Sequence, residues 1–484
     1  MPASSPKQPS LKSNSSVMKE KRDTTGDVVV VRTDLDGVEE QPEEEEDAVF
    51  GKGDGTVNYR SLGWMSASVM IIKSQIGVGV LGIPSSFQTL GLIPGIIILL
   101  FFGVTTTWAD VYIGFFKLKH PQVYSLYDAG QLMFGRVGAE IFGWSYWFLM
   151  AMIASSALVS LSTALNAIST HGTCTAVFVA VAAIAVYPAA SLRTLEKIRF
   201  VGWIGLVSIL SAIFTGMIAV AAGGRPSLAP QTGPLNLEIV YWGTPTFSEA
   251  MQAVSAIFFS LTGTSAFLPI AAEMRHPKLY VRAVLIGQSV VVGMYLLVGI
   301  VVYNYAGQYV ASPALGTAGP LIKKIAYGLA LPGLYFTALF YTHLPAKFIF
   351  LRLLRNSRHL TSSTKTHWFT WLGCTLGCML FSYIVAEAIP VFDGLVSLVG
   401  ALFGAMCTLI AEACMYLYDV RGDFRRKEKR TFRLWFGVVF NVFLLVVGAF
   451  VLVAGTYGSV ISIKDSYAAG SSKVWSCADN SGSV

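Results

Sequence analysis

Eleven separate runs of mainly apolar residues fill the chain from residue 65 to residue 458. A helix needs about 20 apolar residues to cross the hydrocarbon layer of a bilayer, and the runs are of about that length. The sequence therefore predicts an all-α integral membrane protein with eleven transmembrane helices. The runs lie at 65–90, 92–116, 139–166, 172–190, 198–222, 247–272, 281–305, 325–350, 367–388, 391–418 and 434–458.

Composition supports a membrane protein. Hydrophobic residues make up 54% of the chain and charged residues only 13%, with a mean hydropathy of +0.59; soluble domains carry about 25% charged residues. The net charge of +7 divides into −5 for residues 1–60 and +12 for the remainder. Because the basic residues lie in short gaps between apolar runs, they indicate membrane topology and a lipid bilayer as partner, with no nucleic acid.

The basic residues also predict the orientation. Loops after even-numbered spans hold twenty Lys and Arg residues, and the opposite side, with the C-terminal segment, holds five. Positively charged loops remain in the cytoplasm. The N-terminus is therefore expected in the cytoplasm and the C-terminus on the other side.

Three regions follow from these patterns. Residues 1–60 are predicted to be a disordered, acidic cytoplasmic tail, open to regulatory partners, because they contain few large apolar groups. Residues 61–458 form the eleven-span domain, and residues 459–484 a short non-cytoplasmic tail. Cys174 and Cys477 both fall on the outer side, where a disulfide is conceivable. Cys374 and Cys378 have the spacing of a metal half-site but no second ligand pair, so no metal or other cofactor is expected.

Two spans contain residues that disfavour a continuous helix. The first has GVGVLGIP at 77–84, and the sixth has SLTGTSAFLP at 260–269. Glycine followed by proline lets a membrane helix unwind for a few residues and then resume. The two breaks are five spans apart, which predicts two inverted repeats of five spans, with the eleventh span added. Close helix packing through small residues is the alternative.

An unwound segment exposes backbone groups that can bind a ligand. Amides at the start of a half-helix favour an anion, and carbonyls at the end of one favour a cation. A zwitterion such as an α-amino acid suits both. The residues expected to bind it are those of the breaks and an aromatic wall: Gly77, Val78, Gly79, Phe259, Thr262, Gly263 and Thr264. Tyr146 is a further candidate for the wall.

Several segments resemble the amino acid/auxin permease family. They are IGVGVLGIPSSFQTLG in the first span, AAEMRHPKLY at 271–280 and IPVFDGLVSLVGALFG at 389–404. The sequence HLPAKFIFLRLL at 343–354 is similar to fungal neutral amino acid permeases. The resemblance covers residues 60–458. It implies a LeuT-like fold of eleven spans and secondary active transport of neutral amino acids.

Lys73 lies four residues before the first glycine of the broken first span. Sodium-coupled members of the family often carry asparagine there, near a threonine of span 8, and the resemblance places Thr342 at that position. A fixed ammonium should exclude sodium, which suits proton-coupled symport. Because burial disfavours the charged form of lysine, Lys73 could itself carry the proton. His343 is the next candidate, and snorkelling of Lys73 to the cytoplasm is the alternative.

The sequence gives less support to functions other than transport. The sequence has no Gly-x-x-x-x-Gly-Lys-Ser/Thr phosphate loop and no large soluble insertion, so an ATP-driven pump or other enzyme is not expected. An amino acid sensor of the same fold and a vacuolar exporter stay open, and the plasma membrane is the expected address. Glu273 and Glu412, near the cytoplasmic ends of spans 6 and 10, are interpreted as solvated gates or partners of nearby arginines.

Overall fold

A computed structural model describes Val17–Arg22, Val28–Thr33, and residues 62–192, 195–355, 357, 359–360, 364–389, 391–425, 431–468 and 474–482. The chain forms two units, Met1–Gly53 and Asp54–Val484. In the first, β1 (Val17–Arg22) and β2 (Val28–Thr33) pair antiparallel. Four successive valines in β2 favour a strand, since β-branched residues suit extended backbone. The sequence analysis predicted disorder for residues 1–60 and no strands there. The other residues of this predicted tail lie outside the described ranges.

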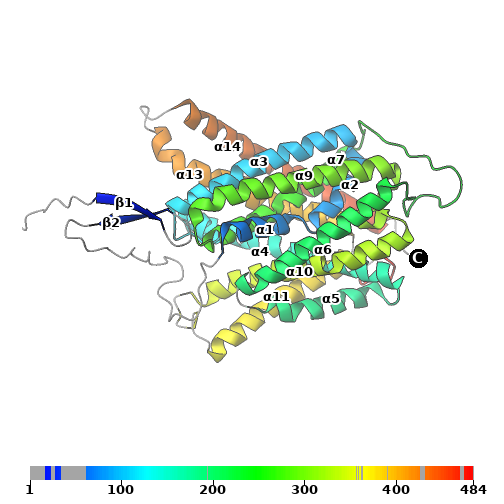
Figure 1. The fold of residues 1–484 in the computed structure, drawn as a ribbon, viewed down its shortest axis with the longest axis horizontal. Coiled ribbons are helices and arrows are strands. Elements are labelled where there is room, and N and C mark those ends of the chain that lie inside the picture. Colours follow the sequence, from blue (N-terminus) through cyan, green and yellow to red (C-terminus); the bar gives the residue numbers. More distant parts are fainter. Residues whose placement is uncertain are drawn as a thin grey trace, which may run out of the picture. The chain divides into compact units, whose positions relative to one another are not determined.

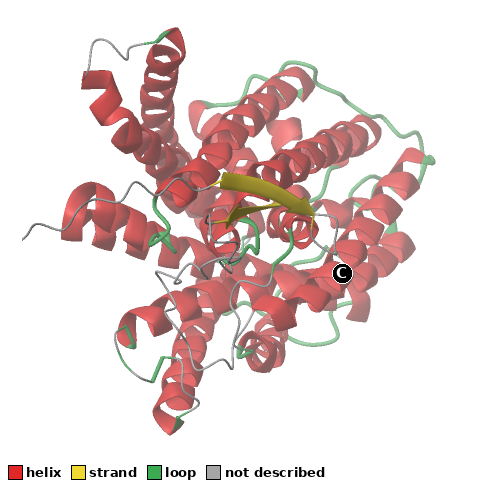
Figure 2. Cartoon of the chain, turned by 60° about the vertical axis from the view of Figure 1, so that its left-hand side comes forward, coloured by secondary structure: helices red, strands yellow, loops and turns green. Residues whose placement is uncertain are grey.

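Helices build the second unit (Figure 2). Its α-helices are α1 (Trp64–Gln75), α2 (Ile83–Leu90), α3 (Leu92–Lys119), α4 (Leu126–Ser169), α5 (Thr175–Ala190), α6 (Leu195–Ala221), α7 (Phe247–Leu261), α8 (Phe267–Ala272), α9 (Tyr280–Ala306), α10 (Pro320–Leu353), α11 (Lys365–Ala388), α12 (Phe392–Val399), α13 (Ala411–Arg425), α14 (Phe432–Phe450) and α15 (Thr456–Ala468). Short 3₁₀ segments are η1 (Gly79–Gly82), η2 (Thr262–Ala266), η3 (Pro277–Leu279), η4 (Gly307–Tyr309) and η5 (Ala314–Thr317). The π-helical turns are η6 (Gly400–Gly404), η7 (Met406–Ile410) and η9 (Val451–Gly455).

The described residues contain ten helical segments long and apolar enough to cross a membrane. The sixteen-residue α5 is a shorter apolar helix. At 1.5 Å per residue it spans about 24 Å, less than the typical hydrocarbon thickness of about 30 Å. The predicted count of eleven spans includes α5. α4 begins earlier than the predicted span at 139–166, and it has a kink at Gly135, whose positive φ of 68° favours glycine.

Both predicted breaks are present. The first broken span consists of α1, η1 and α2, and the second broken span consists of α7, η2 and α8. They run antiparallel: Leu62 N donates to Glu273 O at one end (3.2 Å), and Gly243 N donates to Leu90 O at the other (2.9 Å). Helices five spans apart make equivalent contacts, since α1 packs on α9 while α7 and α8 pack on α3. This arrangement confirms the two inverted repeats.

The two broken spans form the centre of the helical unit. In the most apolar window of each, 94% of the residues are buried, against 28% for Phe432–Ala468. Figure 1 shows α1 with α3 and α9 on one side and α6 and α10 on the other, and α1 contacts both α9 and α6. The breaks are therefore enclosed by protein, whereas the last span presents apolar side chains suited to lipid.

The C-terminal residues 474–482 fold back onto the ends of α4 and α5. A disulfide joins Cys477 to Cys174, the pair named from the sequence. Thr175 Oγ1 donates to Ala478 O (2.6 Å), and Asn166 Nδ2 donates to Asn480 Oδ1 (2.8 Å). Because disulfides form in oxidising compartments, this bond supports a non-cytoplasmic position for that end of the helices.

The orientation can be tested with single cysteines on a background without free cysteines. Lys119, at the end of α3, and Asp465, in α15, are both exposed. We expect an impermeant thiol reagent added outside cells to label Asp465→Cys and to label Lys119→Cys only after permeabilisation, as the charge distribution predicts. Labelling of both variants from the same side would contradict the topology.

Candidate functional site

The two breaks meet in the interior, and their glycines permit the contact. A side chain on Gly79 would place its Cβ 2.7 Å from Ser260 Cα, and one on Gly263 would lie 2.6 Å from Ser74 O. Each break therefore packs directly on the backbone of the other broken span. The small residues thus provide both the breaks and the close packing that the sequence analysis had treated as alternatives.

Side chains from neighbouring spans satisfy backbone carbonyls where α1 ends. Tyr341 Oη, from α10, donates to Ser74 O. Tyr295 Oη, from α9, lies 2.8 Å from both Gln75 O and Ser260 O, and so bridges the two broken spans. Buried carbonyls without partners are costly, and these contacts stabilise the unwound backbone within the helical unit.

A small cavity lies at the crossing. It is lined by eleven uncharged residues: Ser74, Gln75, Val78, Gly79, Ile153, Phe259, Ser260, Thr262, Gly263, Thr337 and Tyr341. Five of the seven residues predicted to bind a ligand belong to this lining, since only Gly77 and Thr264 do not. Gly77 instead faces Thr337 and Lys73, and Thr264 Oγ1 donates to Thr408 Oγ1 (3.2 Å).

Six lining residues were missed by the sequence analysis: Ser74, Gln75, Ile153, Ser260, Thr337 and Tyr341. For Ser74 and Gln75 a local signal existed, because they are polar residues directly before the first break. For Ile153 and Tyr341 none existed, since apolar and aromatic residues are common throughout the spans. Tyr146, the other proposed wall residue, packs on Phe348 at 5.9 Å between ring centroids and is not among the lining residues.

Lys73 is fully enclosed beside the first break. Its Nζ donates to Thr337 Oγ1 (2.9 Å) and to Ile76 O (3.2 Å), and lies 5.4 Å from the centroid of the Phe336 ring. The side chain is 1% exposed, so Lys73 does not snorkel to a surface. Its ammonium thus donates to two oxygen atoms, one a backbone carbonyl at the break and the other a hydroxyl of α10.

The structure corrects the predicted partner of Lys73. Thr337, and not Thr342, accepts its hydrogen bond. The two threonines are five residues apart on α10, and at 3.6 residues per turn their side chains point about 140° apart, so they cannot face the same site. Thr342 Oγ1 is buried without a hydrogen-bond partner among the described residues.

His343 is buried away from the break. Its Nδ1 lies 3.3 Å from Ala190 O, and its ring packs edge-on against Trp371 at 5.2 Å. These contacts connect α10 to the end of α5 and to α11. The structure therefore does not bring His343 together with Lys73 and the lining of the cavity.

A buried ion pair closes the end of the helical unit where α1 begins. Lys347 Nζ lies 2.6 Å from Glu273 Oε1, which also accepts from Tyr124 Oη (2.8 Å). The partner of Glu273 is thus a lysine and not the arginine expected. Both charged side chains are less than 8% exposed. These contacts tie the end of the second broken span to α10 and to the segment between α3 and α4.

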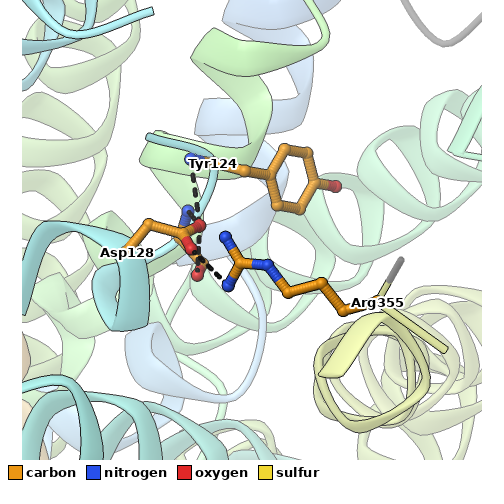
Figure 3. A network of polar contacts seen from close by, with 4 residues as sticks. Tyr124, Asp128 and Arg355 are labelled. Carbon is orange, nitrogen blue, oxygen red and sulfur yellow. Dashed lines mark hydrogen bonds and ion pairs between the residues drawn. The ribbon is translucent and has the colours of Figure 1, made fainter. Parts of the chain in front are cut away.

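A second polar cluster lies beside this pair (Figure 3). Asp128 accepts from the backbone amides of Tyr124 (3.2 Å) and Ser125 (3.1 Å), as an N-cap partner of α4, and pairs with Arg355 at 3.4 Å. Figure 3 shows the Tyr124 ring directed away from Asp128 while its amide points to the carboxylate. Tyr124 therefore contacts both acidic groups, one through its backbone and one through its hydroxyl.

Comparison with known proteins finds relatives that match most of the chain. Proteins named transmembrane transporter from Fusarium pseudograminearum and Gibberella moniliformis are each 35% identical to the chain, over 90% of it and 91% of theirs. The N amino acid transport system protein of Neurospora crassa is 31% identical over 88% of the chain and 90% of its own length. A solved Na⁺-coupled sialic acid symporter covers 84% of this chain and 92% of its own at 12% identity, with a TM-score of 0.49, too weak a likeness to bear on function.

A family model described as transmembrane amino acid transporter protein matches residues 60–461. The match includes both broken spans, the cavity and the buried ion pair. The chain therefore belongs to the transmembrane amino acid transporter family.

Proposed function

We propose that this protein is a proton-coupled symporter of neutral amino acids that works by alternating access. The observation that carries the proposal is the uncharged cavity at the crossing of the two broken spans. Membrane carriers commonly bind substrate where discontinuous helices of two inverted repeats meet. The Neurospora crassa relative, named an amino acid transport system protein, supports an amino acid as substrate.

The ends of the half-helices suit a zwitterion. η1 begins at Gly79, which lines the cavity, and continues into α2; the positive end of a helix dipole favours a carboxylate there. α7 ends there, and its last carbonyls favour an ammonium. Phe259 O already accepts from both the backbone amide and the hydroxyl of Thr262, so a substrate ammonium would have to bind another carbonyl at this end of α7.

The lining also favours a neutral substrate side chain. None of the eleven lining residues is charged, so a charged side chain would enter without an opposite charge. Val78, Ile153 and Phe259 supply an apolar surface for the substrate side chain.

Lys73 is the proposed coupling residue. Its ammonium is held by a carbonyl and a hydroxyl oxygen, ligands that a sodium ion would also use. An ammonium group at this position repels sodium. The proposal therefore assigns a proton as the driving ion. It also assigns the protein to the plasma membrane.

Uptake by the purified protein in liposomes tests the proposal. We expect an inward proton gradient to drive accumulation of labelled L-alanine, L-leucine or L-phenylalanine, with L-glutamate and L-lysine excluded. A sodium gradient alone should have no effect. Binding without accumulation would favour a sensor, and location of the tagged full chain in the vacuolar membrane would favour an exporter.

Glu273→Gln should weaken closure at the end where α1 begins. The substitution leaves the Lys347 ammonium buried without its counter-charge, and breaking a buried pair costs about 3–5 kcal/mol. We expect faster hydrogen exchange of the amides of Leu62 and Arg275, which are hydrogen-bonded at this end. Glu140→Gln is the control, because the Glu140–Arg352 pair is partly exposed. Equal hydrogen exchange of these amides in the two variants would contradict a role of the Glu273–Lys347 pair in closing this end.

A further inference from the structure

Two acidic residues lie deep among the helices without a basic partner. Asp110, on α3, and Glu412, on α13, are at most 1% exposed, and the two groups interact electrostatically. Within the part of the chain that the structure describes, neither residue forms an ion pair. Asp110 Oδ1 and both carboxyl oxygens of Glu412 have no hydrogen-bond partner in the described part of the chain.

A third buried group faces this pair. The Tyr280 hydroxyl, at the start of α9, is 0% exposed and also lacks a hydrogen-bond partner among the described residues. Its ring packs against Gly114, one helical turn beyond Asp110. Among the described residues, Tyr280 interacts electrostatically with both carboxyl groups, and Cys407 interacts with Glu412. Three helices thus direct unsatisfied oxygen atoms into one buried region.

Two glutamines connect this region to the cavity. Gln288 Nε2 donates to Asp110 Oδ2 (2.5 Å), and Gln75 Nε2 donates to Gln288 Oε1 (3.1 Å). Gln75 lines the cavity directly before the first break. The side-chain oxygen of Gln75, Oε1, has no hydrogen-bond partner among the described residues. A change of charge at Asp110 can therefore reach the substrate site through two hydrogen bonds.

Two neighbouring carboxylates cannot both stay ionised in such a place. A buried carboxylate without a counter-charge is costly, and a bound proton neutralises it. A protonated carboxyl group also becomes a donor, which would satisfy one of the free oxygens.

We propose that Asp110 and Glu412 form the site that carries the transported proton. One carboxylate takes up a proton from the side where substrate enters and releases it on the opposite side, with no other reactant. Gln288 and Gln75 transmit the change to the first break, beside which Lys73 lies. This inference rests on the proposed function, since it assigns the residues that bind its coupling ion.

The test uses the full chain in liposomes, with an equimolar mixture of labelled L-alanine, L-leucine and L-phenylalanine. Asp110→Asn and Glu412→Gln are expected to lose proton-driven accumulation at least about tenfold, yet to exchange internal for external amino acid within about threefold of the parent. Exchange needs no net proton release, so it separates a coupling role from a structural one. Asp465→Asn, in an exposed position of α15, should match the parent in both assays.

A second measurement does not depend on transport. The infrared spectrum of the purified parent should show the C=O band of a buried protonated carboxylic acid, and Glu412→Gln or Asp110→Asn should remove or shift it. The conservative variants Asp110→Glu and Glu412→Asp should restore part of the accumulation. Absence of the band in the parent would overturn the assignment.

The outcomes separate this inference from the proposed function. If the parent shows no proton-driven accumulation, or is driven by sodium, the proposed coupling fails and the proton site fails with it. If the parent is proton-driven and both variants accumulate substrate as it does, only the assignment of Asp110 and Glu412 is overturned.

Discussion

Replacing Gly79 with valine should abolish amino acid uptake while surface delivery is largely kept. Any Cβ at this position would lie 2.7 Å from Ser260 Cα and 2.9 Å from Ser260 Cβ, which is closer than real Cβ contacts allow. Because the obstacle includes backbone, the two broken spans must separate, and the cavity between them must change shape. Uptake by cells, normalised to surface protein, measures the effect.

The control is Gly293→Val. Gly293 lies in α9, and a Cβ there would meet nothing within 4 Å, so the same substitution in a membrane helix should leave uptake within about twofold of the parent. Gly79→Ala, with the smallest possible side chain, should already lower uptake strongly. Normal uptake by a correctly delivered Gly79→Val variant would show that close contact at the breaks is not required for transport.

Lys73→Met should lower proton-driven accumulation by about 10- to 100-fold, as expected from the loss of charged hydrogen bonds worth about 1.5–3 kcal/mol. Methionine keeps the unbranched stem but cannot donate to Thr337 Oγ1 or Ile76 O. Exchange of internal for external amino acid should fall less, because it does not require net movement of the driving ion. Liposomes with imposed proton gradients distinguish the two activities.

Two further variants examine the same position. Lys324→Met is the matched control, since Lys324 Nζ also donates to a threonine hydroxyl, Thr170 Oγ1 (2.6 Å), but on the surface. Lys73→Asn should introduce sodium dependence if the ammonium occupies a cation site. Accumulation by Lys73→Met equal to that of the parent, at equal protein level, would remove Lys73 from the coupling mechanism.

The breaks could be predicted from sequence because their signal is local. Glycine and proline within an apolar run disfavour a continuous helix wherever the run lies in the fold. The same applies to five of the seven proposed binding residues, which fall within or next to the two breaks. The sequence did not predict the contacts between side chains of different helices, because the partner of each residue lies on another helix.

Lys73 and Asp110 illustrate this limit. The unusual position of Lys73 is evident in one apolar run, but its contact with Thr337 joins residues 264 positions apart. The sequence did not predict a role for Asp110, since a single acidic residue in a span gives no indication of its partner. Its link to Gln288 crosses 178 positions.

The amino-acid sequence by itself determined the membrane class, the approximate bounds of the spans and the two interrupted helices. These depend on hydropathy over about 20 residues and on backbone preferences of single residues, which need no tertiary contact. The tertiary structure decided which oxygen atoms hold Lys73, that Glu273 pairs with Lys347, and that Gln288 donates to Asp110. The reason is that helix rotation and packing set these contacts, and a rotation of one residue, about 100°, replaces one facing side chain with another.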